Sequence, residues 1–336
     1  MRSRFTKLAV LVIGLSVVTA ACGRYSISSI RSLKAFQDAN RYYQRGEYEA
    51  AIGRYEDAVA LKPDLGFAYF FLGNSYDNLY KPARKGEPDN DAHLPKAVAN
   101  YERAIEMLAG SEDPQEQEIH KLSYDYLIAA YGTDKLDDFD KAEPVARQLI
   151  ALDPSEPSVY QALAKMHEDR GEYEVAEGLY LEAIDARPND AFGYQILAGY
   201  YNRQGDFDKT MEAWYSRADV EPNNPEAWHT IGTFYQDKVF RDKALSRTVA
   251  RDYVLKAVDA EDSALAINPD FAEALIYKNI LLRQQALYER DPAVQQALLA
   301  EADELRDRGM AIMADRNAAI GGDDGGGDDG RGGGSL

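Results

Sequence analysis

Four regularly spaced prolines limit the class of structure that the chain can form. Pro154, Pro188 and Pro222 follow one another at intervals of 34 residues, and Pro269 follows after a further 34 residues plus an insertion of 13. Each comes after an Ala-rich or Leu-rich run of helical character, and proline ends a helix because it has no backbone N–H to donate. A period of this length indicates stacked repeats. The sequence therefore predicts an all-α repeat structure.

A 34-residue frame with these prolines at position 32 also aligns the apolar and small residues. The clearest unit begins at Pro157, and its positions 4, 7, 8, 11, 20, 24, 27 and 32 are Tyr160, Leu163, Ala164, His167, Ala176, Tyr180, Ala183 and Pro188. This pattern resembles the tetratricopeptide repeat (TPR), W-x2-L-G-x2-Y followed by A-x3-F and P, a pair of antiparallel helices. The resemblance implies an α-solenoid, or superhelix, of about seven TPR helix-turn-helix units near residues 32–65, 66–111, 121–156, 157–190, 191–224, 225–271 and 272–316.

Residues 1–21 have the organisation of an export signal. Arg2, Arg4 and Lys7 form a positive beginning, and the apolar stretch 8–18 that follows is too short to span a bilayer comfortably. We therefore expect the protein to be exported.

The only cysteine of the chain comes directly after this signal. Residues 19–22 resemble the lipobox of bacterial lipoproteins, although Thr19 stands where that family usually has Leu. The resemblance implies lipid attachment at Cys22 and, because Gly23 replaces the Asp that often retains such proteins in the inner membrane, a location at the periplasmic face of the outer membrane. Residues 22–31 would then be a tether. The alternative is an ordinary cleaved signal, which would leave the protein in the periplasm.

The composition changes near the C-terminus. Residues 317–336 are rich in glycine and aspartate, and we expect them to be disordered because they have little apolar area to offset the entropy cost of folding. Calcium binding by the paired aspartates is an alternative, but their spacing differs from that of an ordered calcium loop.

Residues able to carry catalysis do not form a recognised pattern. The four histidines lie in different units without metal-site spacing, and the sequence has no phosphate-binding loop, nucleophile elbow or dinucleotide fingerprint. A single cysteine excludes a disulfide framework within one chain. The net charge of −19 disfavours binding to nucleic acid. We therefore predict a protein that is not an enzyme and has no metal, cofactor or small-molecule substrate.

The TPR resemblance implies that partners bind the concave surface, which positions 2, 5, 9 and 12 of each first helix line. In the first two units these positions include Leu33, Phe36, Asn40, Tyr43, Phe67, Phe70 and Asn74. Apolar side chains at such positions predict a groove for an apolar or aromatic partner segment, and the two asparagines could hydrogen-bond an extended peptide. The alternative is that the rings pack against the neighbouring unit.

Two units contain long insertions between their helices, over residues 79–96 and 237–256. We expect the first, which has three prolines, to be an extended loop able to contact a partner. In the second, Lys243, Arg247 and Arg251 recur every four residues, which predicts a positive stripe on one helical face. Such a stripe is a candidate docking site for an acidic partner or an anionic head group. Local pairing with the neighbouring aspartates is the alternative.

These features predict a non-catalytic scaffold for protein interactions that is lipid-anchored in the cell envelope. The chain resembles lipoproteins that help assemble envelope machines, which implies that it assists assembly of an envelope complex. The alternative is a carbohydrate-binding or polysaccharide-export accessory lipoprotein, in which surface tyrosines and Trp214 or Trp228 would stack on sugar rings. Both tryptophans fall at signature positions of the repeat, which favours the scaffold.

Overall fold

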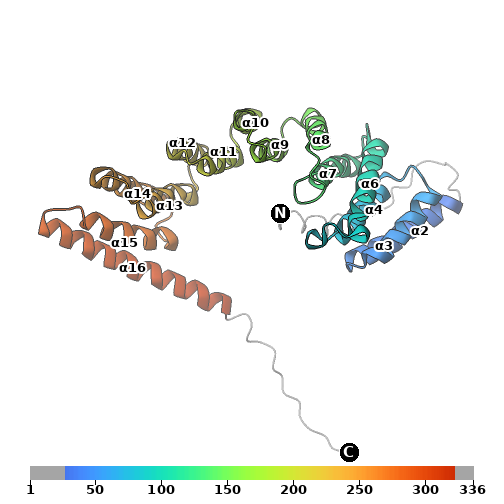
Figure 1. Cartoon of the computed structure of the whole chain (residues 1–336). Coiled ribbons are helices and arrows are strands. Elements are labelled where there is room, and N and C mark those ends of the chain that lie inside the picture. Colours follow the sequence, from blue (N-terminus) through green and yellow to red (C-terminus); the bar gives the residue numbers. More distant parts are fainter. Residues whose placement is uncertain (1–26, 322–336) are drawn as a thin grey trace, which may run out of the picture. The chain divides into compact units, whose positions relative to one another are not determined.

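The computed structural model describes residues 27–321, and all regular secondary structure within this range is helical (Figure 1). Contacts divide the chain into two compact units, which we call unit 1 (residues 27–186 of the described range) and unit 2 (residues 187–321). The prediction of an all-α solenoid built from about seven helix-turn-helix units is confirmed. The export signal, Cys22 and the tail beyond residue 321 lie outside the described residues.

Unit 1 consists of four helix pairs that follow one another along the chain. The second pair has two short helical turns between its members, η1 (Pro82–Arg84) and α5 (Pro88–Asp91). The pairs are α2 (Ile27–Gln44) with α3 (Tyr48–Leu61), α4 (Gly66–Leu79) with α6 (His93–Leu108), α7 (Pro114–Ala130) with α8 (Phe139–Leu152), and α9 (Pro157–Asp169) with α10 (Tyr173–Ala186).

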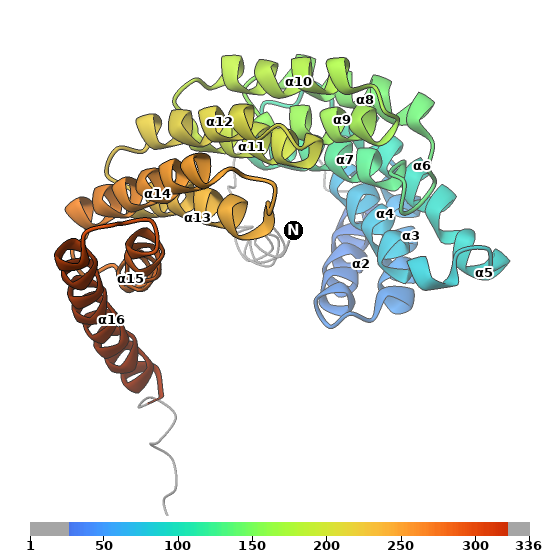
Figure 2. The ribbon, with the colours of Figure 1, turned by 60° about the vertical axis from the view of Figure 1, so that its left-hand side comes forward.

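Unit 2 contains three further pairs, which stack in sequence order (Figure 2). Within the described range none of its helices, nor any in unit 1, has the length and apolar character needed to cross a membrane. The pairs are α11 (Ala191–Gln204) with α12 (Phe207–Val220), α13 (Pro225–Arg241) with α14 (Arg247–Ile267), and α15 (Ala272–Ala286) with α16 (Pro292–Gly321).

The pair α11–α12 shows how local sequence defines one repeat. The side chain of Asp190 caps α11 by accepting a hydrogen bond from the Phe192 N–H at 3.0 Å. Gly205 ends the same helix with a φ of +76°, a conformation that glycine adopts without steric cost. Asp206 then caps α12 by accepting from the Lys209 N–H at 3.1 Å. Helix, glycine turn and capped helix are therefore all encoded locally.

The two helices of a pair approach closely where the repeat places its small residues. A Cβ atom at Gly73 of α4 would lie 2.9 Å from the Tyr101 ring and 3.0 Å from the Ala97 carbonyl oxygen of α6. A Cβ atom at Gly232 of α13 would lie 3.3 Å from the Ala257 carbonyl oxygen of α14. Close packing of the backbones therefore requires glycine at position 8 of the two repeats that contain Gly73 and Gly232.

The first insertion differs from the prediction of an extended loop. It contains η1 and α5 and is closed by Asn90, a buried residue whose side-chain oxygen accepts from the Lys81 N–H at 2.8 Å. The Asn90 amide also donates to the Lys81 carbonyl at 3.2 Å. Because one amide holds both backbone groups of Lys81, the segment is folded and the prediction was wrong.

Two predicted boundaries, the end of the tether and the start of the disordered tail, also differ in the structure. Helix α2 begins at Ile27, so part of the segment expected to be a tether is helical. Helix α16 continues to Gly321, past the position where the disordered tail was expected to begin.

Candidate partner-binding site

Phe70 is one of the residues predicted to line a groove, and the structure places it in the core. Its side chain is 0% exposed. The Phe70 ring packs against the rings of Phe71, Tyr101 and Tyr126, with centroid separations of 5.2, 6.1 and 5.5 Å. The prediction was wrong for Phe70 because the following helices α6 and α7 supply rings that cover it.

The two asparagines predicted to bind a peptide backbone have partners within the chain. Asn74 is 1% exposed, and its side-chain oxygen accepts hydrogen bonds from the Tyr43 hydroxyl at 2.6 Å and the Asn78 amide at 2.8 Å. Asn40 is half-buried and accepts from the Tyr55 hydroxyl at 2.6 Å. Burial raises the pKa of both tyrosines, so they remain protonated donors. Asn74 is therefore unavailable to a partner, and its predicted role was wrong.

An ion pair lies next to this network. The Lys135 ammonium, from the connection between α7 and α8, lies 2.6 and 2.8 Å from the two carboxylate oxygens of Asp77 on α4. Their side chains are 17% and 8% exposed. Asp77, like Asn74 on the same helix, therefore has its partner within unit 1.

The remaining predicted groove residues belong partly to the same core. Phe36 and Phe67 are half-buried and pack against it, and the Phe36 ring lies 5.8 Å from the Tyr55 ring. Leu33 is 42% exposed on α2. The alternative, that the rings pack within the repeat stack, describes unit 1 better than an open groove does.

The positive stripe predicted in the second insertion is not a single helical face. Lys243 lies in the turn between α13 and α14, where its ammonium donates to the Phe240 carbonyl, whereas Arg247 and Arg251 lie on α14. Arg247 donates to the Leu287 carbonyl at 2.7 Å and lies over the Tyr288 ring at 5.2 Å. The spacing argument fails because the helix begins only at Arg247.

The expected alternative, pairing of the stripe with nearby aspartates, is also not what the structure shows. Asp242 pairs with Lys238 at 3.0 Å, and Asp252 pairs with Lys256 at 3.1 Å. Those lysines are one helical turn away from each aspartate, which is the ordinary geometry of a surface pair.

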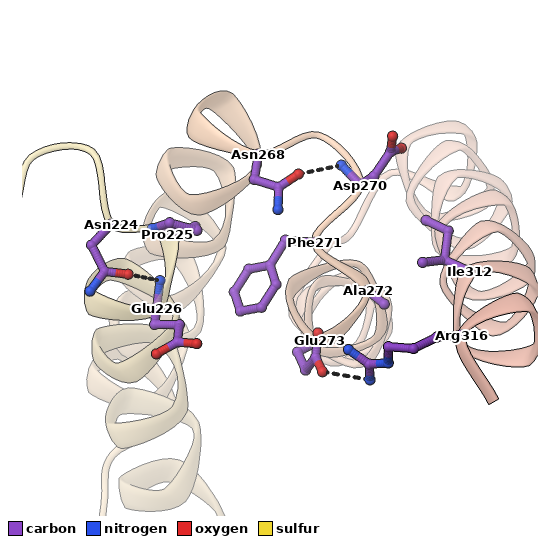
Figure 3. A pocket seen from close by; sticks show the side chains of 10 residues that line it. All are labelled: Asn224, Pro225, Glu226, Asn268, Asp270, Phe271, Ala272, Glu273, Ile312 and Arg316. Carbon is purple, nitrogen blue, oxygen red and sulfur yellow. Dashed lines mark hydrogen bonds and ion pairs between the residues drawn. The ribbon is translucent and has the colours of Figure 1, made fainter. Parts of the chain in front are cut away.

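Unit 2 contains a pocket of about 350 Å³ where the first turns of α13 and α15 meet the C-terminal half of α16. Figure 3 shows the Phe271 ring pointing into the space between α13 and α15, with Glu226 and Glu273 on either side. We call this the Phe271 pocket. It is lined by Asn224, Pro225, Glu226, Asn268, Asp270, Phe271, Ala272, Glu273, Ile312 and Arg316.

Two of the three carboxylates in the Phe271 pocket are neutralised by arginines of α16. Arg316 lies 2.9 Å from Glu273, and Arg308 lies 2.6 Å from Asp270. Burial opposes ionisation of Glu273, but the bond from Arg316 still holds the pKa of its carboxyl below the ordinary value. Glu226 is exposed and has no ion-pair partner within residues 27–321. The pocket thus presents a half-buried ring and one uncompensated negative charge.

A buried acid lies behind this pocket. Both carboxylate oxygens of Glu261 on α14 lie 3.0 Å from Nδ1 of His229 on α13, and Glu261 is 0% exposed. The His229 ring in turn meets the Phe271 ring edge-on at 5.4 Å. Burial raises the pKa of Glu261 to about 7, although the bond to His229 opposes the shift.

Sequence reasoning did not single out Glu261, although a signal for it exists. When the 13 inserted residues are left out of the count, Glu261 falls at position 24 of its repeat. Four other repeats have an aromatic residue at that position, and all four are buried: Tyr55, Tyr101, Tyr180 and Trp214. A carboxylate in an aromatic column is therefore the signal that could have identified a buried titratable group.

Aromatic stacking on sugars has little support at the two tryptophans. Trp214 is 7% exposed and packs 5.2 Å from the Phe234 ring. Trp228 is half-buried and meets Tyr215 edge-on. In the part of the chain that the structure describes, no group of three or more His, Cys, Asp or Glu side chains is arranged to hold a metal ion.

Comparisons with known proteins connect this geometry to a family. Residues 39–79 match a family profile described as TPR repeat, and residues 159–192 match one described as tetratricopeptide repeat. Among curated proteins there is no match.

Three similar solved structures illustrate the structural comparison. The C-terminal part of a TPR repeat-containing protein from Cytophaga hutchinsonii shares 15% identity, with 82% of this chain and 98% of that chain covered and a TM-score of 0.49. MamA from Desulfovibrio magneticus RS-1 shares 14% identity, with 57% and 96% covered and a TM-score of 0.40. YrrB, described as a TPR protein with an unusual peptide-binding site, shares 16% identity, with 59% and 91% covered and a TM-score of 0.36.

Proposed function

Because residues 39–79 and 159–192 match tetratricopeptide-repeat profiles, we propose that this chain is a non-catalytic scaffold that binds a protein or peptide partner and is held in the bacterial envelope by lipid at Cys22. The Phe271 pocket is the observation that carries the binding part of this proposal. It combines an accessible aromatic ring with a few polar groups, a combination that is common in protein interfaces and ligand pockets.

The chemistry of the Phe271 pocket favours a basic side chain of the partner. The aliphatic stem of a lysine or arginine can lie against the Phe271 ring, and its charge can pair with the Glu226 carboxylate. Asp270 and Glu273 are already paired with Arg308 and Arg316, so Glu226 supplies the charge that selects a cation. The partner segment is therefore basic, in keeping with the net charge of −19 on this chain.

The envelope part of the proposal rests on the sequence. An export signal over residues 1–21 and a cysteine directly after it support lipidation at Cys22 and location at the periplasmic face of the outer membrane. In this setting a repeat scaffold assists assembly of an envelope complex by holding one component at the membrane.

Site-specific photo-crosslinking tests the binding part. A photoreactive phenylalanine derivative at position 271 should crosslink a defined partner in cells, whereas the same group at position 240 should not. Phe240 is the matched control because it is an exposed ring of unit 2, 68% accessible, outside the pocket. Glu226→Lys should remove the crosslink at position 271 by repelling a basic segment. Equal crosslinking at both positions would contradict the pocket as the site.

Metabolic labelling tests the anchor. Cells supplied with an alkyne analogue of palmitate should transfer it to the wild-type chain, because the lipobox cysteine is the acceptor. Cys22→Ser should take up no label, since it removes the only thiol of the chain. Label that persists in Cys22→Ser would show that the lipid is attached elsewhere.

A further inference from the structure

Helix α2, the first described helix, has an apolar face that unit 1 leaves uncovered. Ile27, Ile30 and Leu33 are 70%, 59% and 42% exposed. They recur every three residues, so they adjoin one another on the helix surface. The opposite face of α2 is buried, with Ser32 and Ala39 both 0% exposed. The apolar face is therefore not part of the core of unit 1.

The charges on α2 are unusual for a chain of net charge −19. The helix has three cations, Arg31, Lys34 and Arg41, and one acid, Asp38, which pairs with Arg41. Arg31 and Lys34 are exposed beside Ile27, Ile30 and Leu33, and neither has an ion-pair partner within residues 27–321. Apolar residues flanked by free cations are the pattern of a helix that lies in a membrane interface.

The distance to the lipid supports the same partner. Only five residue steps separate Cys22 from Ile27. A fully extended chain spans at most 3.6 Å per residue, so Ile27 lies within about 18 Å of a lipidated Cys22 whatever path the chain takes. The hydrocarbon and headgroup regions of one leaflet together measure roughly 20 Å. Five residue steps between Cys22 and Ile27 are thus few enough for the first turn of α2 to reach the membrane surface.

We propose that the N-terminal half of α2 lies on the membrane, with Ile27, Ile30 and Leu33 inserted among the lipids and Arg31 and Lys34 paired with anionic phospholipid headgroups. This inference rests on the lipid anchor of the proposed function. It adds a second contact that fixes how unit 1 is oriented on the bilayer, because attachment at a single point leaves the orientation free. Each basic residue near an anionic surface strengthens this second contact.

Fluorescence of the full lipidated chain tests this contact. Ile30→Cys and Leu33→Cys would be labelled with an environment-sensitive nitrobenzoxadiazole group and reconstituted into vesicles of phosphatidylethanolamine and phosphatidylglycerol, some of them containing doxyl-labelled lipid. Gly178→Cys is the matched control, because a Cβ atom there meets nothing within 4 Å and α10 belongs to the last pair of unit 1. Cys22 does not interfere, since its thiol carries the lipid.

The inference expects an emission about threefold higher at positions 30 and 33 than at position 178, and quenching by doxyl lipid only at the first two. Arg31→Glu with Lys34→Glu, or vesicles of phosphatidylcholine alone, should remove most of this difference. Protein that floats with the vesicles but shows equal, unquenched emission at all three positions would overturn the membrane contact and leave the anchor intact. High emission at position 30 without doxyl quenching would also overturn it, because a second copy or another segment of the chain then covers α2. Protein that does not float would overturn the anchor itself, and the inference with it.

Discussion

Units 1 and 2 use the same repeat but differ in which side chains remain accessible to a partner. In unit 1, Phe70 and Asn74 occupy positions 5 and 9 of their repeat, and both are buried by contacts within the unit. In unit 2, Glu226 and Phe271 border a pocket and remain accessible. Position 5 is Phe70 in the second repeat of unit 1 and the exposed Gln195 in the first repeat of unit 2, so position in the repeat does not by itself decide exposure. Phe70 is buried because rings of the following helices α6 and α7 pack against it.

A second contrast lies in the column that faces the glycine of the first helix. Opposite Gly73 of unit 1 is Tyr101, and opposite Gly232 of unit 2 is Glu261. A Cβ atom at Gly232 would lie 2.5 Å from a carboxylate oxygen of Glu261, so the acid occupies the space that a ring fills elsewhere. Unit 2 thereby contains a buried carboxylic acid at the position that Tyr101 occupies in unit 1.

The largest expected effect is at Phe70. Phe70→Ala should destabilise unit 1 by about 3–5 kcal/mol, because it removes a fully buried ring and leaves a cavity. Hydrogen exchange of α4 and α6, measured together with the urea midpoint, checks the result. Phe240→Ala, at a ring that is 68% exposed, is the control and should change stability by less than about 0.5 kcal/mol. Similar losses in the two variants would mean that Phe70 is not a core residue.

The second effect concerns Glu261 and pH. Because the pKa of Glu261 is raised from 4.5 to about 7, the folded chain holds this proton more tightly than the unfolded chain does. The resulting stability is fully present below pH 4.5 and is lost as the pH rises through 7. A pKa difference of this size corresponds to about 3 kcal/mol.

Glu261→Gln tests this sign, since it keeps the shape and cannot titrate. Urea midpoints at pH 5 and pH 8 should show that the wild-type chain loses stability relative to Glu261→Gln as the pH rises. Parallel pH profiles for the two chains would contradict the raised pKa.

An intermediate effect is expected at the ion pair of unit 1. Lys135→Met should cost about 1–3 kcal/mol, because the carboxylate of Asp77, 8% exposed, loses its cation. Lys165→Met removes a cation from an exposed pair with Asp169 and should cost less than about 1 kcal/mol. Adding Asp77→Asn to Lys135→Met should recover part of the loss in chemical denaturation. If Lys135→Met and Lys165→Met lost the same free energy of unfolding, the stability of unit 1 would not depend on the Lys135–Asp77 pair.

The smallest effect on stability is expected at Glu226. Glu226→Gln should change the free energy of unfolding by about 0.5 kcal/mol, because the side chain is exposed and loses only its interaction with the N-terminal end of α13. The same change should reduce crosslinking of a basic partner from position 271. A variant that lost stability instead would show that Glu226 supports the fold and does not serve the pocket.

Part of the candidate site could be predicted from sequence and part could not. The pairing of helices followed from local signals such as Gly205 and the aspartate caps, whose effects do not depend on distant residues. The predicted groove failed at Phe70, because Tyr126 covers it from a helix more than 50 residues later in the chain. The predicted stripe failed at Lys243, because the start of α14 could not be read from charge spacing.

The sequence by itself determined that this chain repeats a helix pair, since helix ends, turns and the small residues at close approaches are encoded within each 34-residue frame. Only the tertiary structure decided that Phe70 and Asn74 of unit 1 are buried while unit 2 keeps an accessible pocket at Phe271. The physical reason is that exposure depends on which side chains from other helices reach a residue. The order of residues within one repeat leaves that undetermined.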